Sequence, residues 1–252
     1  METITNNLTL EQWSDIERSP SHEILERDVL PGYLRERRWF SSKSRDINSV
    51  SIKHQMNIPG SLMPGYLWLL NVNYTDNSSE NYLMGVCFVP EREMPEEQMR
   101  PPVLCSLNLG LENGWLCDAT WCNGFRSDLF RHFILQSDIA SGDCHLRFHT
   151  HPAFARLARD IHSSRLLNAE QSNTSIIFGN SFFLKIYRKV ELGVNPDVEI
   201  SKFITTETQF TETPAWMGEI VWQTPEGNIG VGRASDQIRR QHALLRLSGS
   251  RS

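Results

Sequence analysis

The sequence predicts an α+β protein whose sheets are mainly antiparallel. Three pairs of short segments rich in β-branched and aromatic residues are each joined by a polar or glycine-containing link, and two further segments carry helical patterning. Strands joined by short links run antiparallel, because a parallel connection needs a crossover of a dozen or more residues. A chain of 252 residues is long enough for one large hydrophobic core or two modest ones.

The first strand pair lies in the N-terminal third of the chain. A weakly helical, acidic lead precedes it, and residues 66–74 and 82–89 are expected to form a hairpin across the polar loop 75–81. A basic cluster lies between the lead and the hairpin: Arg35, Arg37, Arg38, Lys43 and Arg45. Two interpretations of the cluster stay open. It could bind phosphate or an acidic partner, or its arginines could pair with acids while Trp39 and Phe40 are buried.

The second strand pair follows a proline-flanked acidic linker, residues 91–102. Residues 103–109 and 115–117 are the expected strands, and Asn113-Gly114 is the expected turn, because this dipeptide favours tight hairpins. A helix is expected next, capped by Asn123 or Ser127. Its apolar residues recur at helical spacing: Phe125, Leu129, Phe130, Phe133 and Ile134.

The third strand pair comprises residues 175–178 and 182–187, with a turn at Gly179-Asn180 between them. Side chains alternate along a strand, so Lys185 is expected to share a face with Phe183 and Tyr187.

A second helix is expected to begin at Asn195-Pro196-Asp197. This run combines a capping side chain, a proline at the first helical position and an acid near the positive end of the helix dipole. Ile200, Phe203 and Ile204 are expected to form its buried apolar face, with Glu199 at the edge of that face.

Charge and composition exclude several classes of protein. The formal net charge is −5, which argues against general nucleic-acid binding, since that function normally needs a basic face. No apolar run approaches the roughly 20 residues that span a bilayer, and no secretory signal is visible at the N-terminus. The chain has five cysteines, an odd number without a regular framework, so we expect a reducing, cytoplasmic compartment.

Three features could carry chemistry in the last third of the chain. A polar loop at residues 169–175 could offer backbone N–H groups and hydroxyls to phosphate oxygens. Lys185 on the following strand could contact phosphates, and a helix carboxylate, Glu199, could hold that lysine in place. Structural alternatives remain open: Lys185 could interrupt an apolar strand, and Glu199 could pair with Lys202.

Four runs of sequence resemble the bacterial maltokinases, including those fused to or paired with trehalose synthase. Three lie in the last third: Glu170-Gln171-Ser172-Asn173-Thr174-Ser175, Leu184-Lys185-Ile186-Tyr187-Arg188 and Gly193-Val194-Asn195-Pro196-Asp197-Val198-Glu199-Ile200. The fourth resembles the N-terminal cap domain of that family: Pro31-Gly32-Tyr33-Leu34-Arg35-Glu36-Arg37-Arg38-Trp39-Phe40, continuing to Lys43-Ser44-Arg45. The resemblance covers about residues 25–50 and 165–222 and is looser between them.

The resemblance implies a kinase-like architecture in three parts. These are an antiparallel-sheet cap subdomain at residues 1–90, an intermediate subdomain at 91–164 and a protein-kinase-like N-lobe at 165–232. The resemblance fades after Gly227, and residues 233–252 are expected to be a divergent tail. It further implies ATP and Mg²⁺ as cofactors, and maltose as the sugar that a complete kinase converts to maltose 1-phosphate for α-glucan synthesis. By position, the implied nucleotide contacts are Gln171, Ser172, Asn173, Thr174, Ser175, Lys185 and Glu199, with Glu199 as the helix partner of Lys185.

The sequence departs from the family where the catalytic lobe would supply its motifs. A His-Gly-Asp catalytic loop and a later Asp-Phe-acid metal motif do not occur. The string nearest to the catalytic-loop motif is Ser141-Gly142-Asp143-Cys144-His145, but it precedes the phosphate loop, whereas the family's catalytic loop follows it. We therefore expect no catalytic residue and no metal ligand in this chain, a missing C-lobe and no activity of the chain alone.

An alternative function is a noncatalytic docking module for trehalose synthase or another glucan enzyme. A half-lobe would expose apolar surface, so self-association is also expected. Other chemistries have weaker support: Cys144, His145, His149 and His151 match no standard zinc spacing, and the Gly-x-Ser-x-Gly motif of hydrolases is absent.

Overall fold

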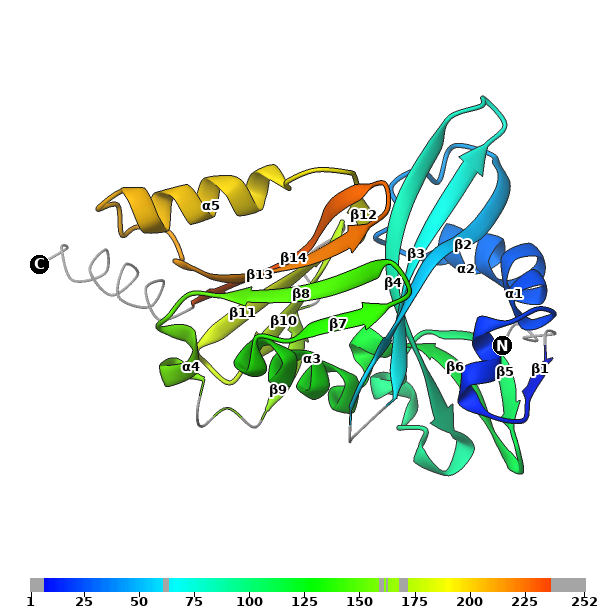
Figure 1. The fold of residues 1–252 in the computed structure, drawn as a ribbon. Coiled ribbons are helices and arrows are strands. Elements are labelled where there is room, and N and C mark those ends of the chain that lie inside the picture. Colours follow the sequence, from blue (N-terminus) through cyan, green and yellow to red (C-terminus); the bar gives the residue numbers. More distant parts are fainter. Residues whose placement is uncertain (1–6, 61–63, 159–160, 162, 168–171, 237–252) are drawn as a thin grey trace, which may run out of the picture. The chain divides into compact units, whose positions relative to one another are not determined.

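The computed structural model describes residues 7–60, 64–158, 161, 163–167 and 172–236 (Figure 1). It confirms an α+β fold built on antiparallel-rich sheets. The chain divides into two compact units, Met1–Asp128 and Leu129–Ser252, which are described separately. The finer subdomain limits at residues 90, 164 and 232 stay predictions.

The sheet of the first unit follows the order β1-β5-β6-β4-β3-β2. Along this order the β1–β5 pair is parallel, and the other neighbours pair antiparallel. Its strands are β1 (Asn7–Leu10), β2 (Ile47–Ile58), β3 (Gly65–Tyr74), β4 (Ser79–Pro90), β5 (Val103–Leu109) and β6 (Glu112–Asp118). Its helical elements are η1 (Trp13–Glu17), α1 (Ser21–Ile24), η2 (Leu25–Val29), α2 (Leu30–Glu36), η3 (Glu91–Glu93), η4 (Glu97–Met99) and η5 (Ala119–Trp121).

The hydrophobic core of this unit forms where the helical segment from α1 to α2 packs along the sheet. Leu25, Leu30 and Leu34 from that segment are fully buried in one cluster with Trp68 and Leu70 of β3. The first predicted hairpin is confirmed, because β3 and β4 pair antiparallel and are linked by residues 75–78. Strand β4 begins at Ser79, earlier than the sequence indicates.

The second hairpin exists, but its predicted turn is wrong. The chain turns at Gly110 and Leu111, where Gly110 has a φ of 57°, and Asn113 and Gly114 already lie inside β6. Gly114 is a glycine because of packing: a Cβ built there would lie 2.4 Å from the carbonyl oxygen of Val89. Asn113-Gly114 therefore does not mark the turn. Glycine is selected by close packing as well as by turn geometry, so the dipeptide alone does not distinguish the two.

The sheet of the second unit is antiparallel throughout and follows the order β7-β8-β13-β14-β11-β10-β9. Its strands are β7 (Asp138–Ser141), β8 (Cys144–Thr150), β9 (Ser164–Leu167), β10 (Asn173–Phe178), β11 (Phe182–Tyr187), β13 (Trp216–Thr224) and β14 (Gly227–Asp236). The two-residue strand β12 (Lys189–Val190) follows β11. Its helices are α4 (Phe154–Leu157) and α5 (Pro196–Glu207), while α3 (Asn123–Leu135) spans the division between the units.

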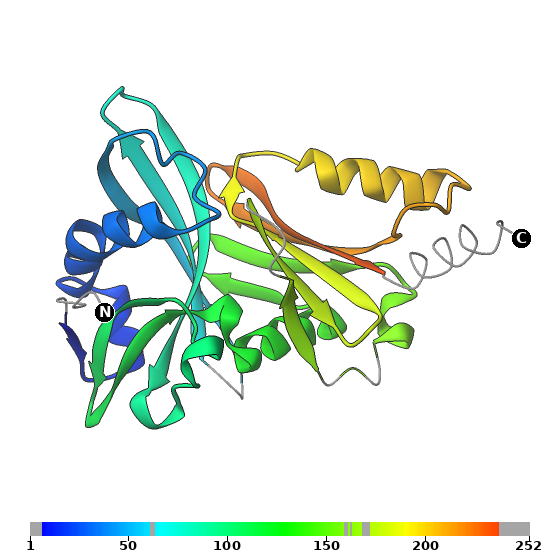
Figure 2. The same cartoon turned by 180° about the vertical axis from the view of Figure 1, so that it is seen from behind.

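One face of this sheet is covered by the end of α3 and by α4, and the other face by α5, as both views show (Figures 1 and 2). Aromatic side chains fill the first interface. The rings of Phe130 and Phe178 stack at 4.4 Å between centroids, and those of Phe154 and Phe182 lie 4.6 Å apart. The predicted helix over residues 125–134 is confirmed, although Ser127 lies inside α3 and is not its cap.

Helix α5 begins as predicted but presents a different face to the sheet. The Asn195 side chain accepts a hydrogen bond from the backbone N–H of Asp197 at 2.9 Å, which caps the helix. Ile200 and Phe203, expected to be buried, are 60% and 59% exposed, whereas Val198 is buried. Ile204, also expected on the buried face, is half-buried, and Thr205 beside it accepts a 2.7 Å hydrogen bond from the backbone N–H of Trp216.

Within the described residues, no helix combines the length and apolar character needed to cross a membrane.

Candidate functional site

Lys185 lies at the centre of a row of polar side chains on the α5 side of the second sheet. Directly opposite it stand Ser175 on β10 and Arg233 on β14. Directly paired residues of antiparallel strands share a face, so the three side chains are neighbours. The predicted alternation along β11 is confirmed, since Phe182 and Leu184 are buried while Phe183 and Lys185 are half-buried.

Asp197, in the first turn of α5, connects this row to the helix. Its carboxylate accepts hydrogen bonds from Lys185 Nζ at 3.2 Å, from the Tyr187 hydroxyl at 3.0 Å and from Arg233 Nη1 at 3.2 Å. Burial alone would raise the pKa of Asp197, but the charges of Arg233 and Lys185 and the hydrogen bond from Tyr187 lower it below the usual 3.8. The carboxylate is therefore held ionised between two cations.

The predicted helix partner of Lys185, Glu199, is replaced by Asp197 in the structure. Residues two apart on a helix point roughly 200° away from each other, so only one of the two carboxylates can face Lys185. Asp197 forms the ion pair and Glu199 is exposed. The alternative pairing of Glu199 with Lys202 is not formed either, because Lys202 binds Glu219 at 2.8 Å.

The predicted phosphate loop is shorter than expected. Asn173, Thr174 and Ser175 belong to strand β10, Ser172 is exposed just before it, and Gln171 lies outside the described residues. Strand pairing with β11 takes up those backbone groups of these residues that point toward it, so fewer remain for a ligand than a loop would offer. Whether these side chains contact a nucleotide stays a prediction.

A cavity of about 530 Å³ lies between α5 and strands β8, β13 and β14. Glu199, Lys202 and Phe203 line it from the helix, and His149 and Glu219 line it from the sheet. Lys185 and Asp197 are not among its lining residues, so the predicted site residues are divided between two sides of α5.

Two residues of the basic cluster, Arg37 and Arg45, are paired within the first unit, while Arg35, Arg38 and Lys43 are exposed. Arg45 binds Asp76 through two 2.9 Å hydrogen bonds, contacts Glu80 at 3.2 Å and lies 3.7 Å from the ring centre of Tyr74. Arg37 lies 4.4 Å from the ring centre of Tyr33 and pairs with Glu36. Trp39 and Phe40 are buried, as the structural interpretation of this run predicts.

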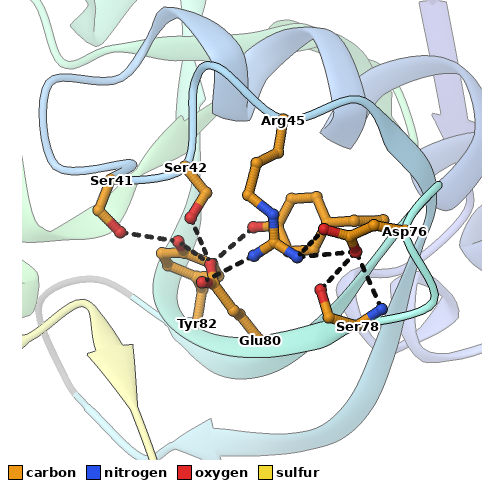
Figure 3. A network of polar contacts seen from close by, with 8 residues as sticks. Ser41, Ser42, Arg45, Asp76, Ser78, Glu80 and Tyr82 are labelled. Atoms are coloured by element: carbon orange, nitrogen blue, oxygen red, sulfur yellow. Dashed lines mark hydrogen bonds and ion pairs between the residues drawn. The ribbon is translucent and has the colours of Figure 1, made fainter.

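Glu80 is the centre of the same network (Figure 3). One of its oxygens accepts hydrogen bonds from the hydroxyls of Ser42, Tyr74 and Tyr82, each at 2.7 Å. Figure 3 shows the loop after α2 fastened in this way to the β3–β4 hairpin. Ser42 and Arg45 therefore fix the loop to the hairpin, and the engagement of Arg45 argues against a phosphate site built on it.

The cysteine and histidine cluster is dispersed. Cys144 is buried, His145 binds Asp138 at 2.8 Å, and His151 accepts a hydrogen bond from the backbone of Ala153. No group of three metal-ligating side chains occurs among the described residues. The five cysteines are free thiols and all are buried.

Comparison with known protein families gives a match for the first unit. Residues 33–121 match the maltokinase N-terminal cap domain. The matched segment takes up about a third of the 252 residues and contains the hairpin and the Glu80 network described above. The predicted resemblance to a maltokinase N-terminal part is therefore confirmed.

Similar solved structures cover more of the chain but resemble it weakly. A glucosamine kinase in complex with glucosamine, ADP and inorganic phosphate is 10% identical, with a TM-score of 0.49 over 85% of this chain. Crystal form B of a glucosamine kinase is 11% identical, with a TM-score of 0.46 over 85% of this chain. The chain spans 40% and 39% of the lengths of these two proteins.

Sequence reasoning alone misses two residues of the polar row. It places Asp197 only at the helix start and Arg233 in the divergent tail, although β14 continues to Asp236. Asp197 could have been considered from the sequence, because it lies two residues before Glu199 in the same helical turn and is an equally plausible partner for Lys185. Arg233 has no such signal, since its place beside Lys185 depends on which strands pair.

Proposed function

We propose that this chain is the N-terminal part of a maltokinase-like protein whose second unit binds the phosphates of ATP. The complete kinase would use Mg-ATP to convert maltose to maltose 1-phosphate in trehalose and α-glucan metabolism. The cap match at residues 33–121 supports the maltokinase-like part. The buried thiols agree with the reducing cytoplasm as its location.

The observation that carries the nucleotide proposal is the Lys185–Asp197 ion pair. In protein kinases, a strand lysine that contacts phosphates is held by a carboxylate on the following helix. Here the lysine lies on β11, the carboxylate is on α5, and their charged atoms are 3.2 Å apart. The pair keeps the ammonium of Lys185 in the polar row, where a phosphate can replace the carboxylate as its partner.

The residues present fit a phosphate group better than they fit a metal ion. Lys185 and Ser175 would hold phosphate oxygens, because one offers a cation and the other a hydroxyl that is buried with no partner among the described residues. Mg²⁺ would neutralise the charge of the bound triphosphate. We assign no residue of this chain to the metal, and we propose that the chain alone does not phosphorylate maltose.

Calorimetric titration with Mg-ATP tests the proposal. The wild-type chain is expected to bind, and Lys185→Gln to bind at least tenfold more weakly. Lys53→Gln is the matched control, since Lys53 is an exposed lysine on β2 of the other unit. Equal affinity of all three proteins, each shown to be folded by circular dichroism, would overturn the nucleotide assignment. Maltose 1-phosphate formation by the pure chain would overturn the proposed inactivity.

A second candidate function, a docking module for trehalose synthase or another glucan enzyme, is favoured by the surface of α5. Leu192, Val194, Ile200, Phe203 and Phe210 lie on or beside this helix and are each more than half exposed. Exposed apolar clusters of this kind are typical of protein contacts or self-association. Light scattering of the chain, alone and with trehalose synthase, distinguishes these outcomes from a monomer without partners.

A further inference from the structure

The polar row beside α5 carries more positive charge than the fold neutralises. Lys185 and Arg233 both pair with the single carboxylate of Asp197. Both contacts are 3.2 Å long, whereas hydrogen bonds between optimally paired charges are about 2.7–2.9 Å. Glu219 stands opposite Arg233 on β13 and is paired with Lys202. Three cations therefore share two carboxylates here, which leaves a local charge of +1.

Hydrogen-bond donors in the same row also lack acceptors. Ser175 is 1% exposed and its hydroxyl has no partner among the described residues. The Nε atom of Arg233 is likewise buried without a partner within the described part of the chain. A buried donor left without an acceptor destabilises the fold, so a ligand that accepts from both would recover that free energy.

Both residues stand directly opposite Lys185, one on each neighbouring strand. The side chain of Lys185 remains 22% exposed and that of Arg233 16% exposed, so solvent still reaches the row. A ligand with several negatively charged oxygens can accept from the hydroxyl, the ammonium and the guanidinium together. A phosphate group has this chemistry, and arginine binds it through paired donors.

We propose that Arg233 is a second phosphate-binding residue, which acts with Lys185 and Ser175 on one phosphate group of the nucleotide. The identity of the ligand rests on the proposed function, whereas the anion site rests on the row itself. Asp197 is the resident counter-ion: it keeps the two cations side by side and competes with the incoming phosphate.

Titration with inorganic tripolyphosphate, beside Mg-ATP, separates the two claims. Arg233→Gln is expected to weaken tripolyphosphate binding at least tenfold, and Arg233→Lys to restore most of it. Arg147→Gln is the matched control, because Arg147 also stands on this sheet and is paired, to Asp138. A folded Arg233→Gln protein that binds tripolyphosphate as tightly as Arg147→Gln does would overturn the inference, and so would absence of binding by the wild type.

Asp197→Asn supplies a test that holds even if Arg233→Gln does not fold. Removal of a competing carboxylate is expected to raise the affinity for tripolyphosphate severalfold, although it removes a partner of both cations. An unchanged or lower affinity in the folded variant would mean that the row serves structure alone.

The titrations distinguish failure of the nucleotide function from failure of the anion site that includes Arg233. ATP binding that depends on Lys185 but not on Arg233 keeps the proposed function and rejects the inference. Tripolyphosphate binding that depends on Arg233, with no binding of ATP, keeps the anion site and rejects the nucleotide function.

Discussion

Asp197 shows how single residues define the candidate site. Its carboxylate lies between Lys185 and Arg233, and its lowered pKa records their attraction. A lowered pKa in the folded state means that the ionised group stabilises the protein above its unfolded pKa. That contribution to stability is lost as the pH falls through the pKa of the group in the folded state.

The stability that ionised Asp197 contributes should depend on pH. The free energy of unfolding of the wild type should exceed that of Asp197→Asn most clearly at neutral pH. The difference should shrink as the pH falls below the usual aspartate pKa of 3.8. Urea denaturation at pH 7, 5 and 3 measures it. A difference that stays constant or grows toward acid would contradict the assigned pairing.

Glu80 has the corresponding role in the first unit. Replacement by alanine leaves the Ser42, Tyr74 and Tyr82 hydroxyls and Arg45 without this acceptor. We expect Glu80→Ala to lower the free energy of unfolding by about 2 kcal/mol, as is usual when buried donors lose their acceptor. Glu93→Ala, at an exposed position, should change it by less than about 0.5 kcal/mol. Equal effects would show that the network is not stabilising.

At the scale of elements, local sequence patterns predict which helices and strands form better than they predict which face of a helix is buried. The hairpin of β3 and β4, the strands β10 and β11 and the cap of α5 follow from residue alternation and capping chemistry. The buried face of α5 does not follow, because Thr205 accepts a hydrogen bond from the backbone N–H of Trp216 and so turns its own side of the helix toward the sheet. The spacing of apolar residues carries no information about this hydrogen bond to a strand elsewhere in the chain.

Two glycines provide a matched test of packing against helix propensity. Gly32 lies in α2, where a Cβ added to it would have no atom within 4 Å apart from its chain neighbours and the backbone of its own helix. A Cβ at Gly114 would instead meet the Val89 carbonyl oxygen at 2.4 Å. Gly32→Ala is expected to stabilise the protein by about 0.5–1 kcal/mol. Gly114→Ala is expected to destabilise it by about 1–3 kcal/mol. Thermal denaturation of both variants checks the signs, and a tolerated Gly114→Ala would refute the β6 packing.

At the scale of the whole molecule, the cap match and the polar row lie in different units. The cap can be predicted because its sequence run is long and local. The polar row can be predicted only in part: Lys185 stands out as a charge in an apolar strand, while Arg233 reaches it through the pairing of β11 with β14. Residues that meet only through sheet topology leave no local signal.

The buried cysteines give a prediction for the folded chain as a whole. Burial raises the pKa of the Cys105 thiol to about 12, and it raises that of Cys117 as well. Thiolates are the reactive form, so the five thiols should react with Ellman's reagent at pH 8 only after unfolding in guanidinium. Rapid reaction of any thiol in the native protein would contradict the buried positions.

The central claim is that nucleotide phosphates lie beside Lys185. An acyl-phosphate derivative of ATP transfers its acyl group to a lysine next to the bound phosphates, and mass spectrometry identifies that lysine. We predict preferential labelling of Lys185, suppressed by excess ATP, with little labelling of Lys43, Lys53, Lys189 and Lys202. Labelling spread evenly over the five lysines and insensitive to ATP would contradict the account.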